Sequence, residues 1–365
     1  MLYFAGIIMA DKYEENIKSA LQNKDMAGAA EIAQEYLDEL NNVRMNIAIT
    51  GEGGSGKSTL VNALRGIKNK TPGAAPTGVT ETTMKPTAYI HPQNDKIVIW
   101  DLPGIGTVNF TADKYLKYVE FEKYDFFIIV SSERFRENDA KLAKEIQKMK
   151  KNFYFVRSKI DNMFLNLTAF LFRLILLTDL YFNAELKKLG FESPKVFLIS
   201  GCSLHLYEFS DLHKTLLEEL PELQRDTLLL ALPNTSLDVI EEKKKTLERK
   251  ITWLTLTSTV VAAVPVPGFS EGVDLKIISK FTQQCRESLG LTPELLQKLS
   301  ELSGVPLEDL KAELKSPLTG GEITPTFVIN VLIRFAVVIA SMALQGGSFT
   351  FRIEVLDKMY FYTIL

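Results

Sequence analysis

The chain has 365 residues, of which 46% are hydrophobic, so it has room for about two or three domains. A hydrophobic core of that size needs no disulfides or structural metals to be stable. Its 42 basic and 45 acidic residues leave a net charge of −3, which argues against nucleic acid as a partner. Two cysteines make no disulfide framework, so we expect a cytoplasmic protein without a disulfide partner, and the three histidines, which lack metal-ligand spacing, are expected at the surface.

Residues 1–40 are predicted to form an N-terminal helical segment. Between residues 14 and 40 the apolar side chains recur at helical spacing, and a break near residues 24–28 divides the segment into two helices. The first ten residues are apolar but lack the basic residues of a secretory signal. Translation from Met9 is an alternative to translation from Met1.

A glycine-rich loop follows the first predicted strand, residues 45–50. Residues 51–58, GEGGSGKS, fit the phosphate-binding pattern G-x-x-x-x-G-K-[ST], and a helix is predicted over residues 57–64. Glycines let successive N–H groups turn inward around an anion at the start of that helix. We expect Lys57 to contact the β- and γ-phosphates of a nucleotide and Ser58 to bind Mg²⁺. The nucleotide-binding residues predicted in this loop are Gly51, Gly53, Gly54, Ser55, Gly56, Lys57, Ser58 and Thr59.

A polar loop rich in Gly, Pro and Thr covers residues 67–90, between that helix and the next motif. This is the place of a nucleotide-sensing switch loop, which needs a threonine that reaches Mg²⁺ and the γ-phosphate. The candidates are Thr77, Thr80, Thr82 and Thr83, and Glu81 lies among them. The alternative interpretation is a solvated linker.

The next apolar strand, KIVIWDLPG over residues 96–104, ends in the pattern D-x-x-G. An aspartate at the end of such a strand can hold Mg²⁺ through water, and the glycine can offer its N–H to the γ-phosphate. Asp101 and Gly104 are the residues predicted for these two roles.

A further apolar strand, residues 152–161, runs into Ser-Lys-Ile-Asp, which is similar to the guanine-specifying element N/T-K-x-D. Asp161 would accept from the two N–H groups on the guanine edge, which adenine cannot supply. The stem of Lys159 would lie over the purine face. Ser158 replaces the usual Asn or Thr, and we expect this change to loosen the loop.

Residues 162–182 are unusually apolar and have three interpretations: a buried helix, a membrane span, or a segment altered by a gene-prediction error or an alternative exon. A span needs ~20 apolar residues. Residues 163–177 include Arg173, and a central arginine costs ~2.5–3.5 kcal/mol. A span would also separate Asp161 from the strand that follows, so we favour the altered segment.

The last predicted strand, KVFLIS over residues 195–200, ends at Ser200-Gly201, where a backbone N–H could meet the guanine O6. Each of the motifs thus lies at a strand end, where open α/β sheets bind their ligands.

Residues 221–365 are predicted to be helical, with a helix start expected near residues 234–238. Residues 255–270 are apolar with two prolines, which favours a buried helical hairpin over a lipid-contacting surface. The run 323–347 is interpreted as a core helix.

The motifs, with longer phrases around them, resemble the immunity-related GTPases, also called interferon-inducible p47 GTPases. The phrases that carry the resemblance are GEGGSGKSTLVNALRGI, GAAPTGVTETTMKPTAY, WDLPGIGT, KNFYFVRSKID and KVFLISGCSLHLYEFSDL. The resemblance covers roughly residues 40–345. Because Lys57 is present, the chain resembles the lysine-bearing branch of the family and not the branch with methionine there.

The resemblance implies a dynamin-like GTPase that binds GTP or GDP with Mg²⁺, self-associates through its GTPase domains and contacts intracellular membranes in cell-autonomous innate immunity. By resemblance, Thr77, Glu81 and Thr83 fall in the switch and the nucleotide-dependent contact surface. Together with Lys57 and Ser58 they are the predicted catalytic residues. The predicted Mg²⁺ ligands are Ser58, Thr77 and Asp101.

Ile105 departs from the pattern of small signalling GTPases, in which a glutamine at this position orients the attacking water. An aliphatic side chain cannot orient water. We therefore expect a single protomer to hydrolyse GTP slowly, and the switch loop or a second protomer to complete the site.

The predicted fold class is α/β: a P-loop GTPase domain over residues 41–220 with a mainly parallel sheet, and an all-helical domain built from residues 1–40 and 221–365. The predicted function is GTP hydrolysis by a cytoplasmic protein that is peripheral on endomembranes. The alternative is a catalytically impaired GTP-binding regulator or decoy of the same family.

Overall fold

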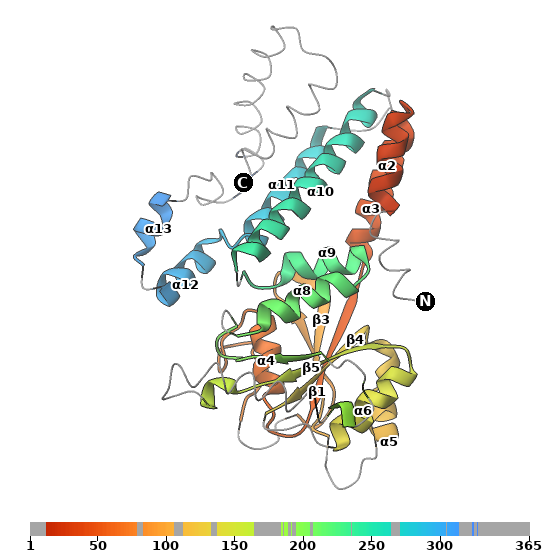
Figure 1. The fold of residues 1–365 in the computed structure, drawn as a ribbon. Coiled ribbons are helices and arrows are strands. Elements are labelled where there is room, and N and C mark those ends of the chain that lie inside the picture. Colours follow the sequence, from red (N-terminus) through yellow and green to blue (C-terminus); the bar gives the residue numbers. More distant parts are fainter. Residues whose placement is uncertain are drawn as a thin grey trace. The chain divides into compact units, whose positions relative to one another are not determined.

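The structure is a computed structural model, and it divides the chain into two compact units (Figure 1). The sheet unit comprises residues 43–220 and 231–236, and the helical unit comprises residues 1–42, 221–230 and 237–365. The residues that the structure describes are 12–78, 83–105, 112–132, 137–163, 195–204, 207–234, 236–263, 271–303 and 305–313, with single positions within 184–191 and 323–327.

The described part of the sheet unit contains a six-stranded sheet in the order β2-β3-β1-β4-β5-β6. Its strands are β1 (Met45–Gly51), β2 (Thr87–His91), β3 (Asn94–Asp101), β4 (Phe126–Ser131), β5 (Asn152–Arg157) and β6 (Val196–Leu198). Neighbouring strands pair in parallel except β2 and β3, which are antiparallel. The predicted mainly parallel α/β sheet is confirmed, and the carboxyl ends of its five parallel strands lie at one edge.

Two of these strands were not predicted. β4 reads FFIIVS, is buried at every position and pairs with β1 and β5. β2 lies at the sheet edge, where its first four residues alternate between partly buried and exposed and its last, His91, is buried. Because β2 begins at Thr87, the polar loop assigned to residues 67–90 was drawn too long at its C-terminal end.

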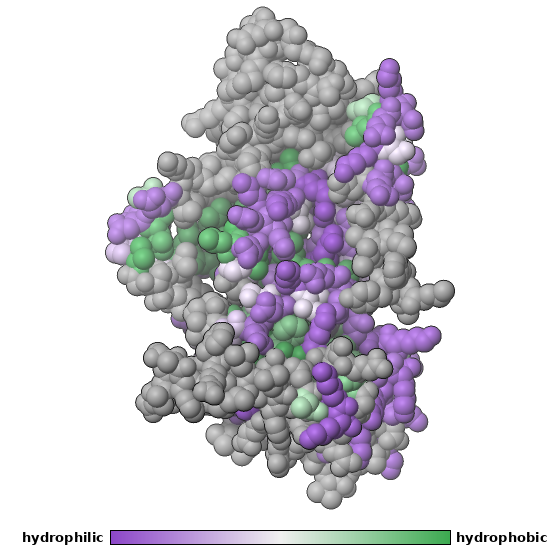
Figure 2. All heavy atoms as spheres, viewed as in Figure 1, coloured by the Kyte–Doolittle hydropathy of each residue, from purple (hydrophilic) through white to green (hydrophobic). Residues whose placement is uncertain are grey.

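Helices of the sheet unit pack against the strands (Figure 1). They are α4 (Lys57–Leu64), α5 (Ala112–Tyr118), α6 (Glu137–Lys148) and α8 (Phe209–Glu219), with short 3-10 turns η1 (Phe121–Lys123) and η2 (Ile160–Met163). Alanine, leucine and isoleucine side chains of α6 are buried in a core that it shares with α5 and the sheet. Its outward side is hydrophilic in Figure 2, as expected for a helix with one apolar face.

The helical unit contains α2 (Lys12–Gln22), α3 (Met26–Asn42), α9 (Glu222–Ala231), α10 (Leu237–Ala263), α11 (Glu271–Ser288), α12 (Pro293–Ser303) and α13 (Leu307–Glu313). The predicted pair of N-terminal helices is confirmed, because α2 ends at Gln22 and α3 begins at Met26. Tyr36 on α3 packs edge-on against Trp253 on α10, and its hydroxyl donates to Asp226 on α9 at 2.6 Å. Asp226 also pairs with Arg249 on α10, so a buried polar cluster ties three helices together.

Helices α10 and α11 run antiparallel. Lys243 Nζ on α10 donates to the carbonyl oxygen of Ser288 at the end of α11 at 3.0 Å, and Lys250 Nζ donates to Gln284 Oε1 at 2.8 Å. The two helices flank residues 264–270, as the predicted hairpin requires. The predicted burial of residues 255–270 lies outside what the structure describes.

Several predictions of the sequence fall on residues outside the described part of the chain. These are the residues 1–11, the switch residues 79–82, most of the segment 162–182, and the run 323–347 except for three positions. Among the helices that the structure describes, none is long and apolar enough to cross a membrane.

The expectation that the histidines lie at the surface was wrong for the two that the structure describes. His91 is 3% exposed and His213 is 2% exposed. His91 ends the edge strand β2, where its Nε2 lies 3.3 Å from the carbonyl oxygen of Leu64 in α4. His213 lies among the buried residues of α8. Both belong to the inward side of an element, a position that residue type alone does not reveal.

Candidate nucleotide site

The P-loop between β1 and α4 has a backbone that only glycine favours at three positions. Gly51, Gly54 and Gly56 have φ values of 137°, 74° and 97°. A Cβ on Gly51 would also lie 2.1 Å from the carbonyl oxygen of Val130 in β4. Gly56 is the left-handed N-cap residue of α4. The loop can therefore turn its backbone around a ligand at the N-terminus of a helix.

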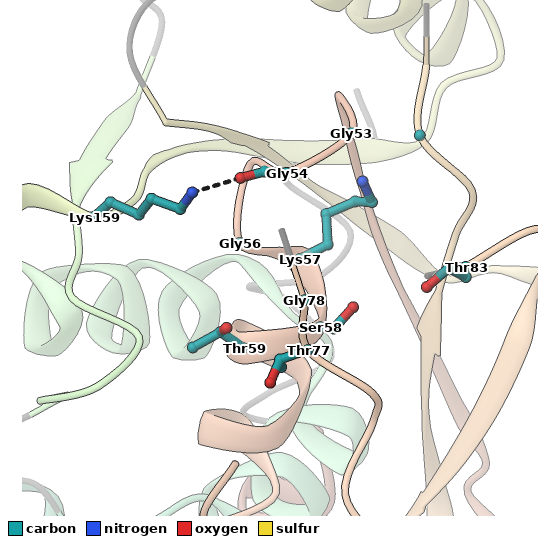
Figure 3. Close-up of a pocket in the computed structure, with 11 residues that line it drawn as sticks. Gly53, Gly54, Gly56, Lys57, Ser58, Thr59, Thr77, Gly78, Thr83 and Lys159 are labelled. Atoms are coloured by element: carbon teal, nitrogen blue, oxygen red, sulfur yellow. Dashed lines mark hydrogen bonds between the residues drawn. The ribbon is translucent and has the colours of Figure 1, made fainter. Parts of the chain in front are cut away.

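A cavity beside this loop brings together residues from four of the predicted motifs (Figure 3). Its lining residues are Gly53, Gly54, Gly56, Lys57, Ser58, Thr59, Thr77, Gly78, Thr83, Gly104 and Lys159. The P-loop, three residues of the predicted switch loop, the D-x-x-G glycine and the base-element lysine thus meet at one place. Of the predicted P-loop residues, Ser55 is buried behind the loop and Gly51 ends β1.

Lys57 is 6% exposed and lies along the inside of the loop. Its Nζ donates to the carbonyl oxygens of Gly51 at 3.1 Å and Glu52 at 2.7 Å. The side chain extends toward Gly53 in Figure 3. A positive charge therefore stands at the wall of the cavity, where it can neutralise phosphate oxygens.

The carboxylate of Asp101, at the end of β3, is fully buried and holds the hydroxyls of two cavity residues. Ser58 Oγ donates to Asp101 Oδ2 at 2.6 Å, and Thr83 Oγ1 donates to the same oxygen at 2.9 Å. Burial raises the pKa of the Asp101 carboxyl, and the two hydroxyl donors partly oppose that shift. Asp101 Oδ1 accepts no hydrogen bond from the described residues.

This donor set fits Mg²⁺, which takes oxygen ligands from carboxylates and hydroxyls in phosphate sites. An orphaned buried carboxylate oxygen is costly unless something fills its coordination. Two of the predicted ligands, Ser58 and Asp101, are in direct contact, and the third, Thr77, lines the same cavity.

Ile105 belongs to the core that the sheet shares with α5 and α6. The side chain is 4% exposed and packs in the cluster that contains Leu102, Tyr115 and Leu116. Its backbone N–H donates to the carbonyl oxygen of Gly51 at 3.1 Å. The residue therefore holds the D-x-x-G loop against the P-loop and contributes no polar side chain to the cavity.

A second cavity lies at the ends of β5 and β6. Its lining residues are Gly56, Thr59, Leu60, Val156, Ser158, Lys159, Asp161, Ile199, Gly201 and Cys202. Gly56, Thr59 and Lys159 line both cavities, so the two adjoin each other. The second cavity has apolar walls and one carboxylate, that of Asp161.

Gly201 lets the chain after β6 pass close to α4, because a Cβ there would lie 2.9 Å from Thr59 Cγ2. Ser200 is fully buried, and its Oγ accepts from the N–H of Cys202 at 3.3 Å. Ser200 is therefore not among the lining residues of the second cavity, whereas Cys202, the residue after the predicted Ser200-Gly201 pair, lines it and is exposed.

The structure gives Ser158 a role opposite to the expected loosening of its loop. Ser158 is 6% exposed, and its Oγ donates to the carbonyl oxygen of Ser55, 103 residues away in the sequence. Its N–H donates to the carbonyl oxygen of Ser131 at 2.8 Å. A short hydroxyl is sufficient here because the P-loop backbone comes within its reach.

Lys159 follows with a left-handed backbone, φ 57°, and its Nζ donates to the carbonyl oxygen of Gly54 at 2.6 Å (Figure 3). The base element therefore contacts the P-loop at two points. The position of Glu81, one of the predicted catalytic residues, lies outside the described residues, so the geometry places only Lys57, Ser58, Thr77 and Thr83 at the cavity.

Comparison with known proteins decides the family. The chain matches the family described as "Interferon-inducible GTPase (IIGP)" over residues 11–362. The chain belongs to this interferon-inducible GTPase family. The resemblance inferred from the motifs is confirmed, and as a member of the family the chain is a GTP-binding protein and a GTPase.

Individual relatives agree with the family match. Interferon-inducible GTPase 5 of Rattus norvegicus is 38% identical over 334 residues, which are 89% of this chain and 71% of the relative. Interferon-gamma-inducible GTPase 10 of Mus musculus is 36% identical over 318 residues, 85% of this chain and 76% of the relative. Among solved structures, Era of Aquifex aeolicus bound to GDP·AlF4− aligns with a TM-score of 0.36 and 26% identity over 48% of this chain and 57% of that one.

Proposed function

We propose that the two adjoining cavities form one site for GTP and Mg²⁺, with the phosphates beside the P-loop and the guanine beside Asp161. The observation that carries the proposal is the shared wall of Gly56, Thr59 and Lys159. A nucleotide has one anionic end and one flat apolar end. The first cavity offers glycine N–H groups and the Lys57 ammonium, and the second offers apolar walls and a carboxylate.

In this assignment Ser58, Thr77 and Asp101 hold Mg²⁺, which when bound neutralises charge on the β- and γ-phosphates. Lys57 adds a second positive charge at the same phosphates. Gly104 presents its N–H toward the γ-phosphate, and the hydroxyl of Thr83 is held at the cavity by Asp101. These groups position and neutralise the transferred phosphoryl group, which is most of what phosphoryl transfer requires.

Selection of guanine follows from Asp161. Its carboxylate accepts from the two N–H groups of the guanine edge, and a backbone N–H at Ser200-Gly201 meets the guanine O6. Lys159 is drawn across the cavity by its bond to Gly54, so its stem can cover the purine face. Adenine offers no matching pair of donors and would leave the carboxylate unpaired.

We further infer that hydrolysis depends on self-association. The buried Ile105 supplies no group that orients water, so the switch residues from Thr77 to Thr83 or a second protomer must complete the site.

Membership of an interferon-inducible family supports a role in cell-autonomous innate immunity, in a cytoplasmic protein that contacts endomembranes peripherally. The same Ile105 also favours a second candidate, a GTP-binding regulator or decoy with little hydrolysis of its own.

The substitution Lys57→Ala tests the site. It removes the ammonium from the phosphate cavity, so affinity for GTP and GDP should fall about 10- to 150-fold, the usual effect of losing hydrogen bonds to a charged group. Turnover should fall with it. Lys144→Ala, at an exposed lysine on α6, is the control and should change neither value. Unchanged nucleotide affinity in a folded Lys57→Ala protein would place the phosphate site elsewhere.

A further inference from the structure

A buried tyrosine hydroxyl joins two backbone segments that border the phosphate cavity. Tyr115 on α5 donates its hydroxyl proton to the carbonyl oxygen of Pro103 at 2.8 Å. The same hydroxyl lies 2.9 Å from Thr50 Oγ1. Tyrosine has a single hydroxyl proton, so Thr50 must be the donor in the second bond. The hydrogen bonds therefore run from Thr50 to Tyr115 to the Pro103 carbonyl.

The three groups are shielded from water. Thr50 is 0% exposed, Tyr115 is 1% exposed, and Pro103 is buried. The ring of Tyr115 lies in a core cluster with Phe127 and Phe155, whose rings carry no hydroxyl. A buried hydroxyl is tolerated only when it is hydrogen-bonded, and here both its donor and its acceptor capacity are used.

The positions of the two partners matter for the site. Thr50 immediately precedes Gly51, the first residue of the P-loop, and Pro103 immediately precedes Gly104, which lines the phosphate cavity. The Pro103 carbonyl and the Gly104 N–H belong to one planar peptide group, which is trans. A bond that fixes the direction of the carbonyl therefore fixes the opposite direction of the Gly104 N–H.

We propose that Tyr115 is a positioning residue that aims the Gly104 N–H at the γ-phosphate by holding the Pro103 carbonyl. The bond also polarises the peptide group and so strengthens its N–H as a donor. Thr50 anchors the hydroxyl to the end of β1, which keeps the D-x-x-G loop in register with the P-loop. This inference rests on the proposed site, and it adds a residue that distinguishes GTP from GDP.

The test is Tyr115→Phe, which removes one oxygen and keeps the ring. The affinity for a non-hydrolysable GTP analogue and the kcat for GTP should each fall about 3- to 10-fold, as for one neutral hydrogen bond. The affinity for GDP should stay within about twofold, because GDP has no γ-phosphate for Gly104 to bind.

Tyr124→Phe is the matched control. Tyr124 is also fully buried in the same cluster, and its hydroxyl donates to the carbonyl oxygen of Val119 at 2.8 Å, a bond that borders no cavity residue. Thermal unfolding should report similar losses for both variants, while only Tyr115→Phe changes the ratio of GTP-analogue to GDP affinity. Equal ratios in the two variants, or an equal loss of GDP and analogue binding in Tyr115→Phe, would overturn the inference. Failure of the unmodified protein to bind either nucleotide would instead overturn the proposed site.

Discussion

A single residue, Cys202, can report chemically on whether the second cavity, the proposed guanine pocket, is occupied. It is exposed and lines the cavity together with Asp161 and Lys159. The second cysteine, Cys285, is fully buried at the interface of α10 and α11, where burial raises the pKa of its thiol. The thiolate is the reactive form of cysteine, so the two residues should differ strongly in reactivity.

A thiol reagent such as iodoacetamide should therefore modify Cys202 and leave Cys285 unmodified in the folded protein. Saturating GDP should slow the modification about tenfold or more, since the guanine would cover the thiol, and ATP at the same concentration should not. Peptide mass spectrometry over a time course measures both rates. A rate at Cys202 that GDP leaves unchanged would speak against the placement of the base.

Other roles at this scale depend on contacts that no sequence pattern contains. The glycines of the P-loop, Lys57, Ser58, Asp101 and Asp161 were found because each belongs to a motif whose spacing reflects the loop geometry. Ser158 and Tyr115 act on backbone carbonyls that the fold brings to them, from 103 and 12 residues away in the sequence. A carbonyl is present at every residue, so the sequence gives no sign of which one is contacted.

At the scale of elements, the buried lysine Lys243 lies where α10 packs on α11. It is 1% exposed, its Nζ donates to the carbonyl oxygen of Ser288, and burial lowers its pKa to about 7. In the unfolded chain this lysine stays protonated up to its ordinary pKa of ~10.4. Between pH 7 and that value the unfolded state binds more protons than the folded state, so this lysine makes stability rise with pH.

The substitution Lys243→Met should remove that rise. The variant should be more stable than the unmodified protein at pH 7 and below, by on the order of a few kcal/mol, because the charged form is no longer buried. The advantage should shrink as the pH approaches 10. Urea unfolding followed by circular dichroism at several pH values measures the difference. Lys244→Met, at the exposed neighbour, is the control, and parallel pH profiles for all three proteins would contradict the assignment.

Elements were predictable where a motif or a clear period marked them. The strand before the P-loop, the helix after it and the two N-terminal helices are present near their predicted bounds. β4 was missed because a continuous apolar run gives no period, and it carries none of the motifs that flagged β1, β3 and β5. β2 was missed because it is an edge strand that directly follows a polar, glycine-rich sequence. Its residues were therefore read as the end of that loop.

At the scale of the whole molecule, the buried Ile105 predicts that activity depends on assembly. Turnover per protomer should rise with protein concentration, and light scattering should show larger species with GTP than with GDP. Glu81→Ala should weaken the rise while leaving nucleotide affinity within a few-fold, because the resemblance places Glu81 at the contact surface. Flat specific activity, with scattering that does not depend on the nucleotide, would leave a monomeric switch or a regulator as the better account.

We propose that the cavity of Asp161 selects guanine for a phosphate site built around Lys57. The most direct measurement is the turnover of GTP, ATP and XTP by the unmodified protein and by Asp161→Asn. The unmodified protein should use GTP, with ATP and XTP each at least about tenfold poorer, because either base leaves a charged acceptor mismatched. Asp161→Asn should reverse the preference to XTP, since its amide can donate to the xanthine oxygen that replaces the guanine amino group. Equal use of ATP and GTP by the unmodified protein, or a retained preference for GTP in Asp161→Asn, would contradict the claim.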